Sequence, residues 1–289
     1  MKTLSVIILS YNTKDLLKKC LESVINCTPT DIKIEIIVVD NASTDGSASM
    51  VERNFPEVKL IRSKKNLGYA KGNNLGIRAS LGEYVLILNS DTVIKKGAID
   101  KLVNFLEKNK QIDIVGPRLL NVDGSFQANC GRFPNLPVVF VMLFKEHWGS
   151  KYVRWSPETS QFVDWLMGAA FMARKRVFEK VGGFDEKIFM YMEEVEWFYR
   201  AKKAGMKSYF LKDAEIIHLG RGSSKTGKKE PILNIYRGLI HFYKKHRSVL
   251  ELIILRFMLK LKAIGALVIG YLTNNNYLKE TYGEAFRLV

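Results

Sequence analysis

The sequence predicts an α/β protein built on a mostly parallel β-sheet with helices on both faces. Short apolar runs with the length of buried strands alternate with segments whose apolar residues recur at helical spacing. Two of these runs are followed within three residues by an aspartate, as expected where a strand reaches the edge of a sheet. The alternation of strand and helix is typical of parallel sheets, because parallel neighbours need a crossover that is usually a helix.

The expected elements follow one another along the first 116 residues. The first run is apolar and β-branched, and the segment after it carries apolar residues on one helical face. "DNASTDGSASMV" reads as a polar turn that opens a short helix, and "NLGYAKGNNLGIRASLG" as a glycine-punctuated turn and helix. The expected strands are residues 4–9, 34–39, 58–61, 84–88 and 113–115, and the expected helices include residues 15–24 and 99–106.

Regular order is expected to fade in the middle of the chain. Residues 117–162 hold four of the seven prolines, which predicts loops rather than long elements, although the apolar run "VVFVMLF" lies among them. Order is expected to return from residue 164.

Length and composition indicate a folded protein with anionic partners. The 289 residues suffice for one large α/β domain plus an appendage, or for two modest domains. A hydrophobic share of 47% argues against disorder. The formal charge of +16 favours an acidic membrane surface, a phosphorylated substrate or nucleic acid. No nucleic-acid reader motif is present and the basic residues crowd near the C-terminus, so nucleic acid is not expected.

Cysteine usage and hydropathy predict a cytoplasmic protein. The three cysteines form neither a disulfide framework nor a CxxC zinc signature. The N-terminal apolar run has six residues and no small-residue cleavage site, so it reads as a strand rather than a signal peptide. No apolar stretch reaches the length of a spanning helix.

The C-terminal segment is basic and amphipathic. Residues 225–262 contain ten Lys or Arg and two acidic residues. Such a helix either lies in a membrane interface or packs on the domain with its basic face in solvent, and the charge of +16 favours the membrane. The apolar face is traced by Leu250, Ile253, Ile254, Phe257, Leu261 and Ile264, and is widened by Leu252, Leu255 and Leu259.

Carboxylates at strand ends are the first candidates for chemistry. Asp40 follows the second strand and Asp91 the fourth, so both are expected at the carboxyl edge of the sheet, where ligands bind. Asp40 suits a ribose or a base, or else caps a turn. Asp91 suits Mg²⁺ or Mn²⁺, which prefer oxygen ligands and often bind substrate phosphates, with His218 after another apolar run as a further ligand.

An acidic cluster lies in "MYMEEVEWFYR". Glu194 near a helix start suits a general base, because the helix N-terminus favours a charged carboxylate. The alternative is a solvated acidic helix start. Elsewhere, the glycines of "NLGYAKGNNLG" do not match the dinucleotide fingerprint GxGxxG.

Six blocks together resemble the family 2 glycosyltransferases of the GT-A fold, most of all their bacterial rhamnosyltransferase-like branch. The resemblance implies a GT-A domain over residues 1–229, with a donor half at about 1–116 and an acceptor half at about 117–229. Residues 230–289 lie outside it as a helical segment. The blocks are "SVIILSYN", "VVDNASTDGS", "NLGYAKGNN", "LNSDT", "GAAFMARKRVFEKVGGFDEKIFMYMEEVEW" and "HLGRGSS".

The resemblance also implies roles for single residues. Asp40 would bind the nucleobase or ribose of a nucleotide-sugar donor, and Asp91 with His218 would hold the divalent metal on its diphosphate. Glu194 stands at the position of the catalytic base, with Glu193 as the alternative. Further donor contacts are expected from Tyr11, Gly68, Asn73, Ser90 and Arg221, and the acceptor side from Trp165, Gly168 and Ala169.

The implied activity is metal-dependent inverting transfer of a sugar. Deoxythymidine diphosphate-rhamnose is the leading donor. The expected acceptor is a saccharide or lipid-linked saccharide in cell-surface polysaccharide synthesis. The basic amphipathic C-terminal helix fits the lipid-linked acceptor and a peripheral position at the inner face of the cell membrane. Two departures are Asn89, where the family often has a first metal-site aspartate, and Glu194, where it usually has Asp.

Two other functions are less consistent with the sequence. A sugar-nucleotide pyrophosphorylase needs an N-terminal glycine-rich basic loop, which "VIILSYNTKD" lacks. An inactive basic scaffold would bind membranes or polyanions without turnover. Neither explains Asp40, Asp91, Glu194 and His218 together.

Overall fold

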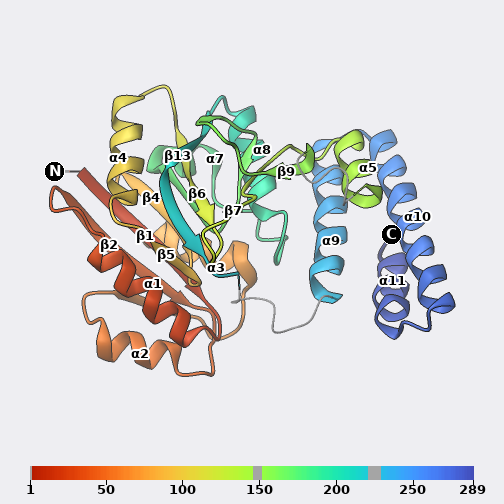
Figure 1. Ribbon diagram of the computed structural model, residues 1–289, viewed down its shortest axis with the longest axis horizontal. Helices are drawn as coiled ribbons and strands as arrows, with labels where there is room; N and C mark the ends of the chain where they lie inside the picture. The colour runs from red at the N-terminus through yellow and green to blue at the C-terminus, as the bar shows by residue number, and fades with distance from the viewer. Residues whose placement is uncertain (1, 146–151, 221–228) are drawn as a thin grey trace.

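The computed structural model describes residues 2–145, 152–220 and 229–289 and shows the expected mixed α/β architecture, with a central sheet between two layers of helices (Figure 1). The predicted fold class, a mostly parallel sheet flanked by helices, is confirmed. The strands of this sheet are β1 (Lys2–Ser10), β2 (Ile32–Asp40), β3 (Lys59–Arg62), β4 (Tyr84–Asn89), β5 (Thr92–Ile94), β6 (Ile114–Leu120), β7 (Phe126–Gln127), β10 (Gln161–Phe162), β12 (Ala170–Arg174) and β13 (Ser208–His218).

The sheet has the order β10-β13-β6-β12-β4-β1-β2-β3, with β5 beside β13 and β7 beside β6. The pairs β4-β1, β1-β2, β2-β3 and β6-β13 are parallel, whereas β12 runs antiparallel to both of its neighbours. A small second sheet, in the order β11-β8-β9, is formed by β8 (Cys130–Gly131), β9 (Arg154–Trp155) and β11 (Trp165–Leu166).

Alternation along the central strands produces a core on each face of the sheet. Leu4, Val6 and Ile8 of β1 contribute to one core, while Ile7 points into the other, because successive strand side chains face opposite ways. The first core is covered by α1 (Lys14–Asn26), α2 (Ser47–Asn54) and α4 (Ala98–Lys108), and the second by α3 (Gly68–Ala79), α7 (Lys175–Val181) and α8 (Glu193–Lys203).

The four-residue glycine spacing in α3 serves helix–sheet packing. A Cβ on Gly72 would stand 2.5 Å from Leu9 Cδ1, and one on Gly76 would stand 2.4 Å from Ile7 Cγ2. Both glycines therefore lie on the side of the helix that packs against β1, and a side chain at either would push α3 off the sheet.

The proline-rich middle of the chain is more regular than predicted. Strand β6 continues through Pro117 to Leu120, because Pro117 lies opposite Leu211, where the register of β13 shifts and a missing N–H is tolerated. The run "VVFVMLF" lies in helix α5 (Leu136–Phe144), where the Asn135 side chain accepts a hydrogen bond from Val138 N and Pro137 stands in the first turn.

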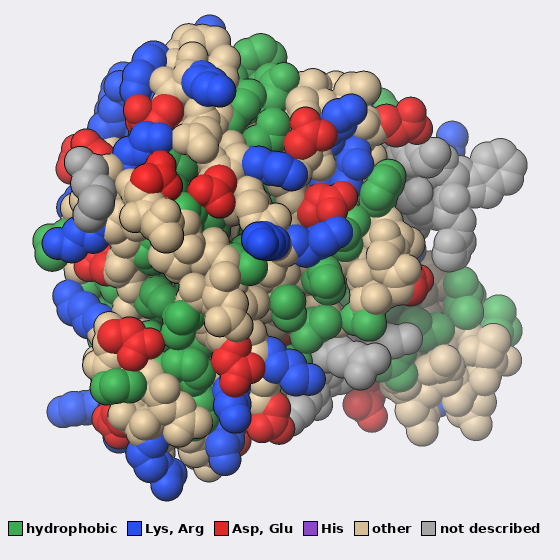
Figure 2. Space-filling model, turned by 60° about the vertical axis from the view of Figure 1, so that its left-hand side comes forward, with side chains coloured by type: hydrophobic (Ala, Val, Ile, Leu, Met, Phe, Trp, Pro, Cys, Tyr) green, Lys and Arg blue, Asp and Glu red, His purple; other side chains and the backbone are tan. Residues whose placement is uncertain are grey.

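The C-terminal residues form a third packed cluster. It contains α9 (Lys229–His246), α10 (Val249–Leu272) and α11 (Asn276–Leu288), together with α5 (Figure 1). Within the described ranges, no helix combines the length and the apolar character that crossing a bilayer requires. Lys and Arg side chains are interspersed with acidic ones over the face shown in Figure 2.

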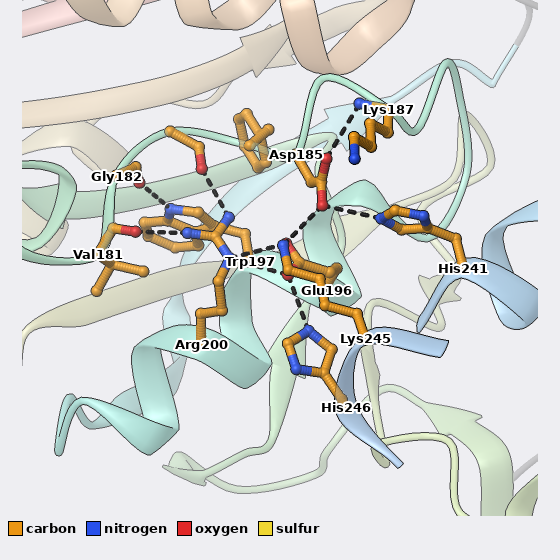
Figure 3. Close-up of polar contacts among 12 residues, drawn as sticks. Val181, Gly182, Asp185, Lys187, Glu196, Trp197, Arg200, His241, Lys245 and His246 are labelled. Carbon is orange, nitrogen blue, oxygen red and sulfur yellow. Dashed lines mark hydrogen bonds and ion pairs between the residues drawn. The ribbon is translucent and has the colours of Figure 1, made fainter. Parts of the chain in front are cut away.

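A buried ion cluster joins α9 to the sheet domain (Figure 3). Glu196 of α8 is fully buried and accepts from Arg200 Nε at 2.9 Å, Lys245 Nζ at 2.8 Å and His246 Nε2 at 2.9 Å. Asp185 accepts from the same Lys245 at 2.6 Å and from His241 at 2.9 Å. Lys245 thus bridges two carboxylates of the domain.

The cluster makes the docking of α9 sensitive to acid. Burial alone would raise the pKa of the Glu196 and Asp185 carboxyls. Hydrogen bonds from Lys245 and the histidines, and for Glu196 also the charge of Arg200, outweigh burial and hold both pKa values below the usual range. A carboxyl whose pKa is lower in the folded state stabilises the fold above its unfolded pKa, and this stabilisation is lost as the pH falls.

We expect Glu196→Gln to lower the free energy of unfolding at pH 7 by about 3 kcal/mol, because Arg200 and Lys245 lose a buried counter-charge. Wild type should lose stability as the pH falls below about 4.5, and the variant should lose less. Urea unfolding of both proteins at pH 7 and at a pH below about 4.5 measures these free energies of unfolding. Glu52→Gln, in the exposed pair with Arg62, is the control and should cost under about 0.5 kcal/mol. If Glu196→Gln and Glu52→Gln lost the same free energy of unfolding at pH 7, the buried cluster would not stabilise the fold as stated.

Candidate active site

Strand register brings the predicted strand-end residues to one edge of the sheet. Ser10 at the end of β1 pairs with Asp40 at the end of β2, and the preceding Leu9 pairs with Asn89 at the end of β4. On the other side, Thr92 of β5 pairs with His218 of β13. This carboxyl edge is where ligands bind in open α/β sheets.

Asp40 has one carboxylate oxygen satisfied and one available. Its side chain is 4% exposed, and Oδ2 accepts from Ser43 N at 3.2 Å, which is the turn contact considered as the alternative role. Oδ1 is buried and receives no hydrogen bond from the described residues. Because buried acceptors are rarely left unpaired, Oδ1 is suited to a ligand hydroxyl or N–H.

Asn41, which the sequence analysis did not single out, holds the neighbouring turn. Its Oδ1 accepts from Leu67 N at 2.8 Å and its Nδ2 donates to Asn66 Oδ1 at 2.9 Å. The turn leads into Gly68, whose φ is +76°. A Cβ there would stand 2.3 Å from Phe189 O, so this glycine serves close approach of the segment before α8.

The other predicted donor-side residues are placed as follows. Ser90 Oγ contacts Thr13 Oγ1 at 2.8 Å, which links the end of β4 to the start of α1. Tyr11 is 43% exposed. Asn73 is buried and donates to Tyr69 O within α3 at 3.0 Å, while its Oδ1 receives no hydrogen bond from the described residues. Arg221 lies outside the described residues.

Asp91 and His218 form a pair, oriented by Gln127 of β7. His218 Nε2 lies 3.3 Å from Asp91 Oδ1, and Nδ1 lies 2.7 Å from Gln127 Oε1. An amide oxygen only accepts, so Nδ1 carries a hydrogen towards Gln127, and Nε2 faces Asp91 Oδ1. Gln127 was not predicted, because nothing in "SFQAN" marks it.

This donor set fits a divalent metal. A carboxylate oxygen and an imidazole nitrogen face each other, and a cation between them would stabilise the arrangement. Adjacent ligands of an octahedral ion bonded at about 2.1 Å stand about 3 Å apart, close to the separation observed. Among the described residues no group of three or more His, Cys, Asp or Glu could hold a metal, so substrate oxygens and water would complete the shell.

Glu193 and Glu194 lie in the first turn of α8, after two residues with left-handed backbone, Tyr191 and Met192. Burial and the charge of Glu194 raise the pKa of Glu193 well above its usual value. Burial also raises the pKa of Glu194, but N–H groups of Gly168 and Val195 and the charge of Arg154 oppose this rise. Glu193 is the more buried of the two side chains.

Tyr69 connects these acids to the acceptor-side loop. Burial raises the pKa of its hydroxyl, and the nearby charges of Glu193, Glu194 and Asp91 raise it further. The hydroxyl donates to Gly168 O at 2.5 Å. Tyr69 therefore lies among the acidic groups of the site, although only the adjacent Gly68 was predicted from the sequence.

The predicted acceptor-side residues are packed rather than open. Ala169 is buried, and its carbonyl accepts from Asn89 N at 2.9 Å, which ties the loop to the end of β4. Trp165 of β11 is 7% exposed and donates to Arg132 O at 2.9 Å. Arg154, exposed on β9, was missed because its segment of the sequence matches no motif.

The fold and the comparisons with known proteins together define a glycosyltransferase of the GT-A type. The family model of glycosyl transferase family 2 matches residues 5–197, which is more than half of the chain. The chain therefore belongs to glycosyl transferase family 2, and the predicted family and enzyme class are confirmed.

Two curated relatives are similar over most of the chain. N-acetylglucosaminyl-diphospho-decaprenol L-rhamnosyltransferase of Mycobacterium tuberculosis is 30% identical over 234 residues, 74% of this chain and 75% of the relative. Low-salt glycan biosynthesis hexosyltransferase Agl10 of Haloferax volcanii is 30% identical over 230 residues, 74% of this chain and 66% of the relative. The first relative supports the predicted rhamnosyltransferase-like branch.

Two solved structures share the fold. GalNAc-T7 with UDP, GalNAc and Mn²⁺ superposes with a TM-score of 0.63 at 20% identity, covering 84% of this chain and 50% of that one. S. aureus TarS superposes with a TM-score of 0.56 at 18% identity, covering 92% and 40%.

Proposed function

We propose that this glycosyltransferase is metal-dependent and inverting. It would move a sugar, with rhamnose as the leading candidate, from a nucleoside diphosphate to a saccharide or lipid-linked saccharide acceptor in cell-surface polysaccharide synthesis. The observation that carries the proposal is the meeting of Asp40, the Asp91–His218 pair and Glu194 around one edge of the sheet.

The donor would lie across the ends of β1, β2 and β4. Asp40 Oδ1 would accept from the nucleobase or ribose, as its buried and unsatisfied position suggests. Asp91 and His218 would hold Mg²⁺ or Mn²⁺ on the diphosphate, with Gln127 fixing the imidazole. When bound, the metal neutralises the charge that develops on the departing diphosphate. GalNAc-T7 was solved with UDP and Mn²⁺, which supports metal use in this fold.

Glu194 is the better candidate for the base. Burial and the charge of Glu194 raise the pKa of Glu193 well above its usual value, whereas at Glu194 N–H donors and the charge of Arg154 oppose the rise that burial causes. Glu194 would take the proton of an acceptor hydroxyl. At the same time the hydroxyl oxygen would bond to the anomeric carbon of the sugar, and the bond from that carbon to the nucleoside diphosphate would break. One such displacement inverts the anomeric centre.

We infer a lipid-linked acceptor and a peripheral position on the cytoplasmic face of the membrane. The Mycobacterium relative is named for a lipid-linked saccharide acceptor. In α10 the residues expected to trace the apolar face, from Leu250 to Ile264, are exposed, whereas Leu255 and Leu259 pack into the third cluster. Arg256, Lys260 and Lys262 on the same helix would favour anionic lipid.

The first test separates metal binding from proton transfer. We expect Asp91→Asn to weaken Mn²⁺-dependent binding of deoxythymidine diphosphate-rhamnose by about 10- to 100-fold, because it removes the charged metal ligand. Glu194→Gln should bind donor and metal normally but lose about 10²- to 10⁴-fold in kcat. Calorimetry and a transfer assay measure the two effects. Metal-independent donor binding by folded wild type would overturn the metal proposal, and near-native turnover by Glu194→Gln would overturn the base.

The second test uses pH. Arg154 lowers the pKa of Glu194, so its removal raises that pKa and leaves less of the ionised base at a given pH. We expect Arg154→Met to move the acidic limb of the kcat/KM profile to higher pH with the donor KM unchanged. Arg53→Met, on the surface of α2, is the control. A profile identical to wild type would show that Arg154 does not act on the base.

The third test concerns the membrane. Phe257→Asp removes an apolar side chain that is 67% exposed, and should weaken binding to phosphatidylglycerol vesicles at least about tenfold. Leu81→Asp makes the same kind of change at a site 79% exposed in the sheet domain and should have no effect. Co-sedimentation measures both. A substitution is used because truncation after Lys245 would also remove Leu255 and Leu259, which pack into the third cluster. Equal binding by the two variants would exclude α10 as the docking face.

A further inference from the structure

A cavity of about 430 Å³ lies away from the strand-end residues, where the small sheet meets α5, α8 and the junction of α9 with α10. This volume falls within the range of about 300–1,000 Å³ that small-molecule sites occupy. Its walls combine cations with aromatic rings and include Arg132, Tyr199, Lys202, Lys203 and Arg247, with Asp164 as the one acid.

Positive charge in the cavity exceeds what its acid can neutralise. Asp164 Oδ1 pairs with Lys202 Nζ at 2.7 Å, and Oδ2 accepts from Phe133 N at 3.3 Å, so both oxygens are engaged. Among the described residues, no carboxylate lies within ion-pair distance of Arg132, Lys203 or Arg247. Glu251 acts on Arg247 without forming an ion pair, and Arg132 and Lys203 are exposed, so the cavity keeps a net positive charge that favours an anionic ligand.

The two arginines are oriented by their surroundings. Arg247 donates from Nη2 to Pro134 O at 3.2 Å and lies 5.4 Å from the centre of the Tyr199 ring. Its Nε is buried and donates to no described residue. Arg132 lies 4.9 Å from the Tyr152 ring and 5.6 Å from that of Trp155. A buried N–H without an acceptor is costly, so the Nε of Arg247 is suited to a ligand oxygen.

The chemistry of the cations selects among anions. A guanidinium presents parallel N–H groups that match phosphate oxygens in bidentate fashion, and Lys203 adds a point charge. Two guanidinium groups and one ammonium group suit a diphosphate better than a single carboxylate.

The cavity adjoins two segments of the chain, one connected to the proposed base and one to the exposed apolar helix α10. Arg132 follows Gly131, the β8 partner of Arg154, whose charge acts on Glu194. Arg247 directly precedes the N-cap of α10, the helix with the exposed apolar face. α5, which also borders the cavity, packs beside α10 and exposes Phe140 and Phe144 (Figure 1).

We propose that this cavity binds the diphosphate group of a lipid-linked acceptor through Arg132, Lys203 and Arg247. The saccharide would extend towards Glu194 and the lipid chain towards the exposed faces of α5 and α10. The proposal rests on the proposed transfer to a lipid-linked acceptor. It identifies the residues that would bind the negatively charged diphosphate of that acceptor.

Direct binding tests the cavity without turnover. Inorganic diphosphate and farnesyl diphosphate are titrated calorimetrically into wild type with a chelator present, so that no metal supports binding at Asp91. Farnesyl diphosphate should bind, and Arg132→Gln and Arg247→Gln should each weaken it at least about tenfold. Asp91→Asn and the surface control Lys18→Gln should bind as wild type does. No binding, or binding unchanged in both arginine variants, would overturn the proposal.

Two comparisons identify the source of the diphosphate. Farnesyl diphosphate should bind more tightly than inorganic diphosphate, because its chain reaches apolar surface. Equal affinity would overturn the assignment to a lipid-linked group and indicate a site for the free anion. In transfer assays, the arginine variants should raise the KM of a saccharide on a lipid diphosphate about tenfold, but not that of the same saccharide on a neutral alkyl chain. Absence of transfer by wild type, with farnesyl diphosphate still bound, would refute the proposed function and leave the cavity's affinity standing.

Discussion

The parallel register of β1 with β2 and β4 is the constraint on which the rest of the site depends. It fixes the ends of three strands beside one another, so that Asp40 and Asn89 flank the last residues of β1. The apolar interiors of these strands, buried on both faces, leave only their ends for polar chemistry. A shift of one residue would turn the buried side chains of β1 to the wrong faces and separate the strand-end groups.

The acids of the site are supported from outside it. Glu193 and Glu194 are buried at the start of α8 at an energetic cost that their raised pKa values express. Two residues further on, Glu196 is held by Arg200 from the same helix and by Lys245 and His246 from α9 (Figure 3). The first turn of α8 is therefore clamped on its other side by the C-terminal helices. Helix α9 thereby holds the helix that carries the proposed base.

Sequence patterns predicted the parts of the fold that depend on local alternation and could not predict those that depend on distant partners. The early strands and helices were predicted because buried strands appear as short apolar runs and amphipathic helices as apolar residues at helical spacing. The continuation of β6 through Pro117 depends on a register shift in β13, nearly a hundred residues later, which no local pattern reveals. Asp40, Asp91 and His218 were predicted as candidates because they follow apolar runs. Gln127, Tyr69 and Arg154 reach the site through pairing and packing, and their own segments carry no signal.

Helix α10 shows the same limit and also connects the proposals. Its apolar residues surround much of the helix, so the sequence alone could not separate the face that packs from the face that remains in solvent. In the structure Leu255 and Leu259 fill the third cluster, while Phe257 and Leu261 stay exposed. An apolar face gains nothing from exposure to water, but one that begins beside a cavity of net positive charge suits a ligand with a charged head and an apolar tail. The excess of basic residues would then serve one molecule at two points, its diphosphate in the cavity and the anionic surface around its lipid chain.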